Sequence, residues 1–331
     1  MVAGRAGKNK IKNGRKSDNL FLGVDGGGTK TLVVLLDGES NVIAEGLSGA
    51  SNPMRVGIEK AVTNISEAVN NACDKSNRNP TDIVAAALGL AGVRRNDIRL
   101  RVRERISRML GTKFVEVVTD ADIALYGAVK DKTGLVVIAG TGSICLGKNE
   151  KGEKGIAGGW GPLAGDEGGG AGIARRALQA IAKASDGRGS STKLSQKAME
   201  YFRAGKPEDL LVAIYAPQID NTRIAGFAKF VSEAAAEGDE VSKQILAEAG
   251  YELGLAATAV IRQLKLQKRK FPIAIVGSIF QSGQIITRPL IETVAKTAPK
   301  AYLIEPPLPP AVAAAQMAFE ICRNEKSLRK L

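Results

Sequence analysis

Residues 21–36 read FLGVDGGGTKTLVVLL, in which three consecutive glycines separate two apolar runs. Leucine and β-branched residues dominate both runs, so the pattern predicts a strand, a tight turn and a second strand. Because glycine has no Cβ, Gly26, Gly27 and Gly28 let the backbone bring its amide groups against a ligand. The stretch therefore predicts a hairpin whose turn can hold a phosphate group.

Polar side chains surround these glycines. Thr29, Lys30 and Thr31 add hydroxyl and ammonium donors after the turn, and Asp25 adds a carboxylate at the end of the first strand. Donors beside one carboxylate suit an anion that brings Mg²⁺ with it better than an anion alone. We therefore expect the turn to bind nucleotide phosphates, with Asp25 beside the metal.

Two better-known phosphate loops do not match this stretch. Gly23 to Gly28 fits the spacing G-x-x-x-x-G, but Thr29 follows where a P-loop has lysine, and a strand rather than a helix comes next. The fingerprint G-x-G-x-x-G of dinucleotide-binding proteins does not lead into a helix here either. A glycine hairpin that acts only as a turn is the remaining alternative.

The composition is that of an ordinary globular protein. Of 331 residues, 44% are hydrophobic and 24% charged, which allows two domains with their own cores. No apolar run reaches the roughly 18 residues that cross a membrane, and no signal core is recognisable. Cys73, Cys145 and Cys322 are scattered, which predicts reduced thiols and a cytoplasmic location. Without histidine, a general base must be another group, foremost a carboxylate.

Part of the net charge of +13 lies at the N-terminus, where residues 1–18 contain six lysine or arginine side chains and one aspartate. Such a tail can contact nucleic acid or an anionic surface, and a solvated tail without a partner is the alternative. The aromatic content of 4% offers little surface for stacking bases. A nucleic-acid role for the whole protein is therefore not expected.

Predicted strands alternate with predicted helices beyond the hairpin, which is typical of an α/β fold. Residues 46–53 are expected to form a loop. Asp120 lies where the predicted strand 114–118 gives way to a helix, and ligands of α/β sheets bind at the carboxyl ends of strands. Asp120 is therefore a candidate catalytic carboxylate, with a helix N-cap as the alternative.

The opening pattern occurs again in the second half of the chain. Residues 134–147 read GLVVIAGTGSICLG, with a turn at Gly140, Thr141, Gly142 and Ser143. Two hairpins of this chemistry, each heading its own half, predict a duplicated architecture with the phosphates of a nucleotide held between the halves.

Residues 158–170 read GGWGPLAGDEGGG and combine the single tryptophan of the chain, Trp160, with Asp166 and Glu167. A sugar ring offers hydroxyls to carboxylates and an apolar face to an indole, so this stretch is a candidate sugar-binding loop. A structural turn before a helix is the alternative.

These motifs resemble those of the BadF/BadG/BcrA/BcrD-type ATPase family, and within it the N-acetylglucosamine kinases and archaeal hexokinases. The resemblance covers the chain from about Leu20 to Ala318. It implies the actin-like, ribonuclease H-like duplicated fold, an α/β fold of two lobes with a central sheet in each. It also implies ATP and Mg²⁺ as cofactors.

The resemblance further implies a role for each motif. The nucleotide would be bound by Gly26, Gly27, Gly28, Thr29, Lys30, Gly140, Thr141, Gly142, Gly226, Gly277 and Ser278. The sugar would be bound by Asn52, Asp120, Ser143, Ile144, Gly159, Trp160, Gly161 and Asp166. Asp120 would be the catalytic base, while Asp25 and Asp166 would hold the metal.

The implied activity is ATP-dependent phosphorylation of N-acetylglucosamine or a related hexose or hexosamine, at its 6-hydroxyl. Two alternatives are an ATPase that activates a 2-hydroxyacyl-CoA dehydratase-type partner, and a non-catalytic sugar or nucleotide sensor. The activators share an iron–sulfur cluster bound by cysteines, and the scattered cysteines here match no such pattern. We expect a homodimer without a membrane partner, and no nucleic acid apart from a weak contact by the tail.

The expected domain organisation has three parts. Residues 1–18 form the basic tail, residues 19–131 with 311–331 form the N-terminal lobe, and residues 132–310 form the C-terminal lobe with helical insertions.

Overall fold

The computed structural model describes residues 19–130 and 132–328, so the basic tail lies outside the described residues. The chain divides into two compact units. One comprises residues up to Val118 together with those from Ala314 onward, and the other comprises Thr119–Ala313. This division differs from the boundary expected at residue 131, because the helix α4 (Asp120–Val129) groups with the second unit.

The first unit is built on a five-stranded sheet in the order β3-β2-β1-β4-β5. Its strands are β1 (Leu20–Gly26), β2 (Thr31–Leu36), β3 (Val42–Ser48), β4 (Ile83–Leu90) and β5 (Val115–Thr119). β1, β2 and β3 pair antiparallel in succession, while β1 and β4 pair in parallel. The predicted first hairpin is confirmed, with Gly26 opposite Thr31.

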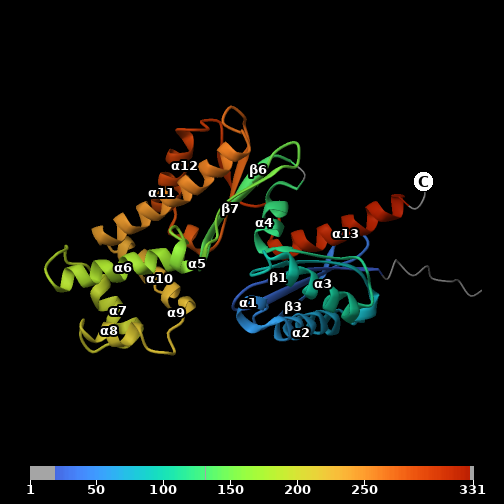
Figure 1. The fold of residues 1–331 in the computed structure, drawn as a ribbon, viewed down its shortest axis with the longest axis horizontal. Helices are drawn as coiled ribbons and strands as arrows, with labels where there is room; N and C mark the ends of the chain where they lie inside the picture. The colour runs from blue at the N-terminus through green and yellow to red at the C-terminus, as the bar shows by residue number, and fades with distance from the viewer. Residues whose placement is uncertain (1–18, 131, 329–331) are drawn as a thin grey trace, which may run out of the picture. The chain divides into compact units, whose positions relative to one another are not determined.

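Helices cover both faces of this sheet (Figure 1). They are α1 (Pro53–Val56), α2 (Ile58–Ser76), α3 (Asn96–Leu110) and α13 (Pro310–Leu328), with the 3₁₀ turn η1 (Pro80–Asp82). Side chains alternate along a strand, so Leu22 packs among the residues of α2 and α3 while Phe21 faces the other way. Phe21 meets Phe319 of α13 edge to face, with ring centroids 4.9 Å apart.

The second unit repeats the first sheet. Its order is β10-β9-β6-β7-β8, which matches β5-β4-β1-β2-β3 strand by strand. β6 pairs parallel with β9 and antiparallel with β7, and β7 pairs antiparallel with β8, as β1 pairs with β4 and β2 and β2 pairs with β3. The strands are β6 (Gly134–Ala139), β7 (Ser143–Lys148), β8 (Lys154–Gly158), β9 (Pro272–Val276) and β10 (Tyr302–Ile304). The duplicated α/β architecture predicted from the two hairpins is therefore confirmed.

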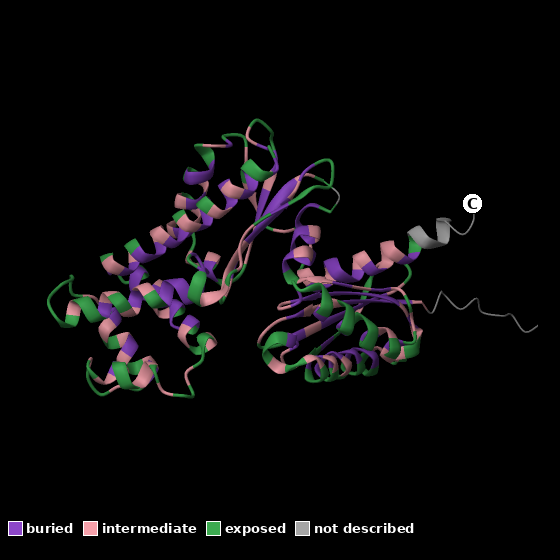
Figure 2. Cartoon of the chain, viewed as in Figure 1, coloured by how far each residue is buried: buried purple, intermediate pink, exposed green. Residues whose placement is uncertain are grey.

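A helical insertion between β8 and β9 enlarges the second unit. It contains α5 (Gly161–Ala164), α6 (Gly170–Ser185), α7 (Leu194–Phe202), α8 (Asp209–Ile214), α9 (Asn221–Gly226), α10 (Ala228–Ala236) and α11 (Glu240–Gln263). η2 (Ser278–Ser282) and α12 (Gln284–Ala295) follow β9. Val137 of β6 lies in the large core of these helices, whereas Val136 faces α4. The strands β1, β2, β4 and β6 are largely buried, and Figure 2 shows the helices buried mainly on one side.

The edge strand β3 includes residues 46–48, which the sequence predicted as loop, and the edge strand β8 was not predicted. In both strands the structure gives a glycine a role in packing against a helix. A Cβ on Gly46 would overlap the carbonyl oxygen of Ala68 in α2, and a Cβ on Gly155 would lie 2.9 Å from Oε1 of Gln263. The prediction of a loop over residues 46–48 was therefore wrong, because Gly46 marks a close helix–strand contact within a strand.

The outer edge of β8 is covered by the side chain of Gln263, the last residue of α11. Its Oε1 accepts the backbone N–H of Ile156 at 2.9 Å, and its amide nitrogen donates to the carbonyl oxygen of Ile156 at 3.1 Å. One side-chain amide thus pairs with both polar groups of an edge residue, as a neighbouring strand would.

Throughout residues 19–130 and 132–328, every helix is too short or too polar to cross a bilayer.

Substitution of Gly46 by alanine tests the contact between β3 and α2. The added methyl group must displace the Ala68 carbonyl, and such overpacking costs about 1–3 kcal/mol. We expect the free energy of unfolding to fall by that amount in a urea titration followed by circular dichroism. Glu45→Ala alters the adjacent, exposed side chain and should stay within about 0.5 kcal/mol of the native protein. Equal stability of Gly46→Ala and the native chain would contradict this explanation.

Candidate active site

The turn of the first hairpin spans Gly27 to Lys30 and closes through a hydrogen bond from the Gly27 N–H to the Lys30 carbonyl oxygen at 3.0 Å. Gly27 and Gly28 are half-buried, whereas Thr29 and Lys30 are exposed. The structure thus presents four of the predicted phosphate-binding residues at one turn, beside the end of β1.

The segment that leads into α1 holds this turn from the protein side. The backbone N–H groups of Ser51 and Asn52 both donate to the carbonyl oxygen of Gly27 at 3.1 Å. The guanidinium of Arg55 donates to the carbonyl oxygen of Gly28, also at 3.1 Å. Arg55 was not singled out in the sequence, because no local pattern connects it to a turn 27 residues earlier.

Thr31 was expected to offer its hydroxyl to a ligand, and this expectation was wrong. Its side chain is fully buried. Its hydroxyl is hydrogen-bonded to the Gly49 carbonyl oxygen at 2.6 Å and to the Ser51 hydroxyl at 2.8 Å. Thr31 therefore fastens the loop after β3 to the hairpin.

Asn52 is the N-cap of α1, and its Oδ1 accepts the backbone N–H of Met54 at 3.0 Å. This use of the oxygen leaves the two N–H donors of the amide for other partners. Because the backbone N–H of Asn52 is bonded to Gly27 of the first turn, any molecule bound by the Asn52 side chain would lie beside that turn.

Asp120 is the first residue of α4, and its Oδ1 accepts the backbone N–H of Ala121 at 3.0 Å. The alternative role as N-cap belongs instead to Thr119, which forms a capping box with Asp122. Asp122 is also paired with Lys154. The Asp120 side chain is exposed, yet loss of solvation around its carboxyl group raises its pKa, against the opposing effect of the Ala121 N–H. The exposed carboxylate of Asp120 is therefore not the N-cap of α4.

The turn of the second hairpin is Gly140 to Ser143, with the Gly140 N–H bonded to the Gly142 carbonyl oxygen at 3.0 Å. The glycine-rich loop after β8 holds it, as the segment before α1 holds the first turn. Its three backbone bonds are Gly159 N–H to Ser143 O (2.9 Å), Gly170 N–H to Gly140 O (2.8 Å) and Ala171 N–H to Thr141 O (2.9 Å). A fourth bond joins the Ser143 N–H to Oδ1 of Asp166 at 3.0 Å.

The predicted sugar-binding residues of this loop differ in exposure. Asp166 is buried, while Trp160 is 74% exposed and Gly159 and Gly161 are half-buried. Ser143 and Ile144 at the start of β7 are also half-buried. Trp160 and Asp166 thus lie on the same loop, with the indole of Trp160 exposed to solvent and the carboxylate of Asp166 buried.

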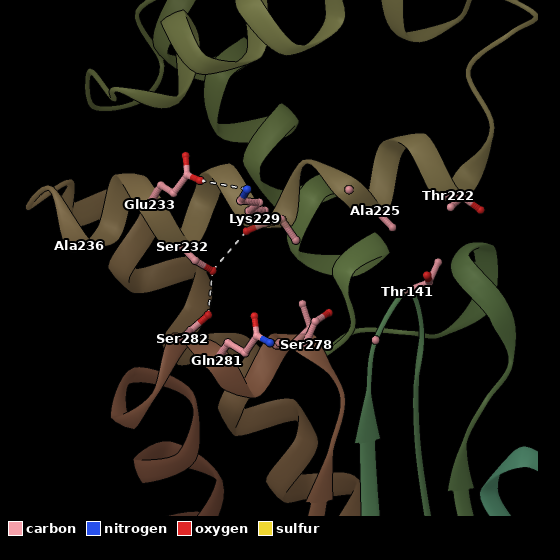
Figure 3. Close-up of a pocket in the computed structure, with 14 residues that line it drawn as sticks. Thr141, Thr222, Ala225, Lys229, Ser232, Glu233, Ala236, Ser278, Gln281 and Ser282 are labelled. Atoms are coloured by element: carbon pink, nitrogen blue, oxygen red, sulfur yellow. Dashed lines mark hydrogen bonds and ion pairs between the residues drawn. The ribbon is translucent and has the colours of Figure 1, made fainter. Parts of the chain in front are cut away.

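A cavity of about 650 Å³ opens beside the second turn, within the second unit (Figure 3). Its walls come from that turn, from α9 and α10, and from η2. The lining residues are Gly140, Thr141, Thr222, Ala225, Gly226, Ala228, Lys229, Ser232, Glu233, Ala236, Ser278, Ile279, Gln281 and Ser282. This volume lies within the roughly 300–1,000 Å³ of ordinary small-molecule sites.

Four residues predicted to bind the nucleotide line this cavity: Gly140, Thr141, Gly226 and Ser278. Gly277 precedes η2 with φ +118°, and a Cβ there would overlap the carbonyl group of Ala139 at the end of β6. A Cβ on Gly226 would lie 2.5 Å from the hydroxyl of Tyr201. Packing against neighbouring protein therefore accounts for both glycines, and Gly226 also opens on the cavity.

Sequence reasoning missed the polar wall of the cavity on α10. Lys229, Ser232 and Glu233 lie on one face of this helix, at the i, i+3 and i+4 spacing that brings side chains together. Lys229 and Glu233 form an ion pair at 3.8 Å. The hydroxyl of Ser282, in η2, is hydrogen-bonded to that of Ser232 at 2.7 Å (Figure 3). Only this helical spacing after Gly226 could have indicated the wall.

The candidate metal ligands do not form a multi-carboxylate cage. In the part of the chain that the structure describes, no three carboxylate or thiol groups gather as a metal site. Mg²⁺ on a nucleotide needs only one or two carboxylates beside the phosphates and water. The half-buried carboxylate of Asp25, at the end of β1 and next to the first turn, fits that requirement.

The fold and the two turns define a class, the two-unit sugar-kinase and actin-like ATPase fold. Over 91% of its length, the chain is similar to a solved N-acetylglucosamine kinase candidate from Chromobacterium violaceum, of which 99% is covered, with 26% identity and a TM-score of 0.76. It also shares its fold with a ROK family glucokinase from Streptomyces griseus, at 18% identity and a TM-score of 0.59, over 91% of this chain and 100% of that one.

The chain belongs to the BadF/BadG/BcrA/BcrD ATPase family, whose model matches residues 22–318. It is 33% identical to an N-acetyl-D-glucosamine kinase of Dictyostelium discoideum, over 92% of this chain and 98% of that protein. It is also 33% identical to an N-acetylmuramic acid/N-acetylglucosamine kinase of Clostridium acetobutylicum, over 79% of this chain and 85% of that protein.

The hydrogen bond between the Ser232 and Ser282 hydroxyls gives a testable coupling. We expect Ser232→Ala and Ser282→Ala each to lower the free energy of unfolding by about 0.5–1.5 kcal/mol, because each removes one partner of the 2.7 Å bond. The double variant should lose little more than either single variant, since both lack the same bond. Urea titrations of the four proteins measure this, and strictly additive losses would show that the two hydroxyls act separately.

Proposed function

We propose that the protein is an ATP-dependent kinase that phosphorylates N-acetylglucosamine or a related hexose or hexosamine at its 6-hydroxyl. The cavity beside the second turn is the observation that carries this proposal. It has the size of a small-molecule site and lies where a nucleoside can extend its phosphates over the Gly140–Ser143 turn. The curated relatives, which are kinases of amino sugars, support the choice of acceptor.

In this proposal the two turns bind the phosphates of ATP through backbone N–H groups and the side chains of Thr29 and Lys30. Phosphoryl transfer depends mainly on positioning and on stabilising charge, rather than on covalent chemistry by the protein. The carbonyl oxygens of Gly27 and Gly140 accept hydrogen bonds from neighbouring backbone N–H groups, so the conformation of both turns is fixed before a ligand binds. Such fixed turns suit this task.

Asp120 is the proposed general base. It accepts the proton of the sugar hydroxyl as the hydroxyl oxygen attacks the γ-phosphorus and ADP leaves. Asn52, Ser143, Ile144, Gly159, Trp160 and Gly161 are the proposed sugar contacts, together with Asp120 and Asp166. The N–H donors of Asn52 and the exposed indole of Trp160 suit the hydroxyls and the apolar face of a sugar.

Mg²⁺ would neutralise charge on the phosphates, with Asp25 as its protein ligand. Asp166, whose Oδ1 already accepts the Ser143 N–H, is the less suitable metal ligand of the two. The homodimer, the cytoplasmic location and the weak nucleic-acid contact of the tail stay predictions from the sequence.

The cysteines count against an activator that shares an iron–sulfur cluster. Cys73, Cys145 and Cys322 are all buried and free. Burial raises the pKa of the Cys73 thiol to about 11, and it also raises that of Cys145. Cluster ligands are thiolates, so buried thiols with raised pKa values are unsuited to that role.

A panel of acceptors tests the proposal directly. With Mg-ATP, we expect ADP formation that depends on N-acetylglucosamine, glucosamine or glucose, measured by a coupled ADP assay and by mass spectrometry of the sugar phosphate. ATP hydrolysis at the same rate without any sugar would contradict the kinase and favour an ATPase.

Asp120→Asn tests the base. We expect turnover to fall by about 10²–10⁴-fold, because positioned proton transfer contributes that much, while AMPPNP binding stays unchanged. Asp122→Asn removes the same charge two residues along α4 and should cost far less. Near-native turnover of Asp120→Asn would overturn the assignment.

The pH dependence gives an independent check on Asp120. A general base must be deprotonated to act, so the enzyme loses activity as the pH falls through the pKa of Asp120. Because loss of solvation raises that pKa, this loss of activity should begin at a higher pH than for an ordinary aspartate. The acid limb of kcat/KM should therefore lie above the value of about 3.9 for an ordinary aspartate. A limb at or below that value would count against Asp120 as the titrating group.

A further inference from the structure

Asp166 combines burial with an unusual backbone conformation. Its side chain is 6% exposed, and its φ of +62° lies in the left-handed region. Among residues other than glycine, asparagine and aspartate occupy this region most readily. A carboxylate is therefore held at this position despite the cost of removing it from water.

The carboxylate lies directly against the second turn. Oδ1 accepts the Ser143 N–H at 3.0 Å. A Cβ on Gly142 would lie 2.5 Å from Oδ1 and 2.7 Å from Oδ2, so the carboxylate fills the space that any other residue at 142 would need. The bonds from Gly159, Gly170 and Ala171 to this turn use backbone groups, whereas Asp166 holds the turn with its side chain.

Negative charge is not what a phosphate-binding turn requires. A carboxylate this close to the turn would repel the phosphates of a nucleotide. Burial also raises the pKa of Asp166, against the lowering effect of the Ser143 N–H.

We propose that Asp166 is a positioning residue for the second phosphate turn, and that it acts as a hydrogen-bond acceptor for Ser143 rather than through its charge or through a metal. The proposal rests on the proposed nucleotide site. It assigns to the loop after β8 a role in nucleotide affinity, in addition to its role towards the sugar.

Two substitutions separate acceptor from charge. Asp166→Asn keeps an acceptor oxygen and tolerates the left-handed φ, whereas Asp166→Gly removes the side chain without straining the backbone. We expect the Kd for AMPPNP to stay within about threefold of the native value in the asparagine variant and to rise by about tenfold or more in the glycine variant. Glu167→Gln, at the exposed neighbouring carboxylate, is the matched control and should change neither.

Isothermal titration with AMPPNP, with and without Mg²⁺, makes the measurement. A metal ligand would lose affinity equally in both Asp166 variants and only when Mg²⁺ is present, and that pattern would overturn the proposal. A purely structural role would reduce the fraction of active protein and hence kcat, whereas a positioning role raises Kd and the KM for ATP. An unchanged Kd in folded Asp166→Gly would also refute it.

Gly142→Ala approaches the same contact from the turn. Its methyl group must push the carboxylate away, so this variant should weaken AMPPNP binding in the native background. In the Asp166→Gly background that obstacle is absent, and the same alanine should add little further loss. Independent, additive losses would contradict an action of Asp166 through the turn.

The nucleotide measurements need no sugar, so they separate this proposal from the kinase itself. A native protein that binds AMPPNP but phosphorylates none of the sugars would refute the proposed function and leave the comparison of Asp166 variants valid. Sugar phosphorylation together with equal nucleotide affinity of the native and Asp166→Gly proteins would refute the positioning role alone.

Discussion

Hydrogen bonds to the carbonyl oxygens of two glycine turns are the constraint on which the candidate site depends. A turn rich in glycine has many accessible conformations, so its amides cannot form a fixed anion site unless other parts of the chain hold it. Here Ser51 and Asn52 hold Gly27, while Gly170 and Ala171 hold the second turn. Donors fixed in this way need no reorganisation when charge appears on a ligand.

The same solution appears in both units because the two sheets share one strand order. In each unit, the helix that follows the last strand of the sheet packs on the sheet of the other unit. α4 follows β5 but packs on the second sheet through Val136, and α13 follows β10 but packs on the first sheet through Phe319. Each unit therefore contains a helix whose preceding strand belongs to the other. This exchange explains why a boundary placed after α4 in the sequence differs from the division by contacts.

Much of the fold could be predicted from the sequence, because the buried strands and the hairpin turns carry strong local signals. β3 and β8 could not, since their glycines serve contacts with helices that lie far along the chain. Asp120 was located by its place after a strand, but the neighbouring capping box of Thr119 and Asp122 was not recognised in the sequence. Thr31 shows the limit most clearly: the residue type suits phosphate binding, and only the fold shows that its hydroxyl is buried. The wall of the cavity on α10 depended on how a helix is docked, which no short motif records.

The amide of Gln263 has a consequence for the behaviour of the protein at high concentration. An uncovered edge strand presents unpaired N–H and C=O groups that can template pairing with another molecule. Because this amide satisfies both groups of Ile156, the outer side of β8 is blocked at that residue. Growth of the second sheet by strand addition from another copy is therefore opposed at this edge, which protects the chain from one common route to aggregation.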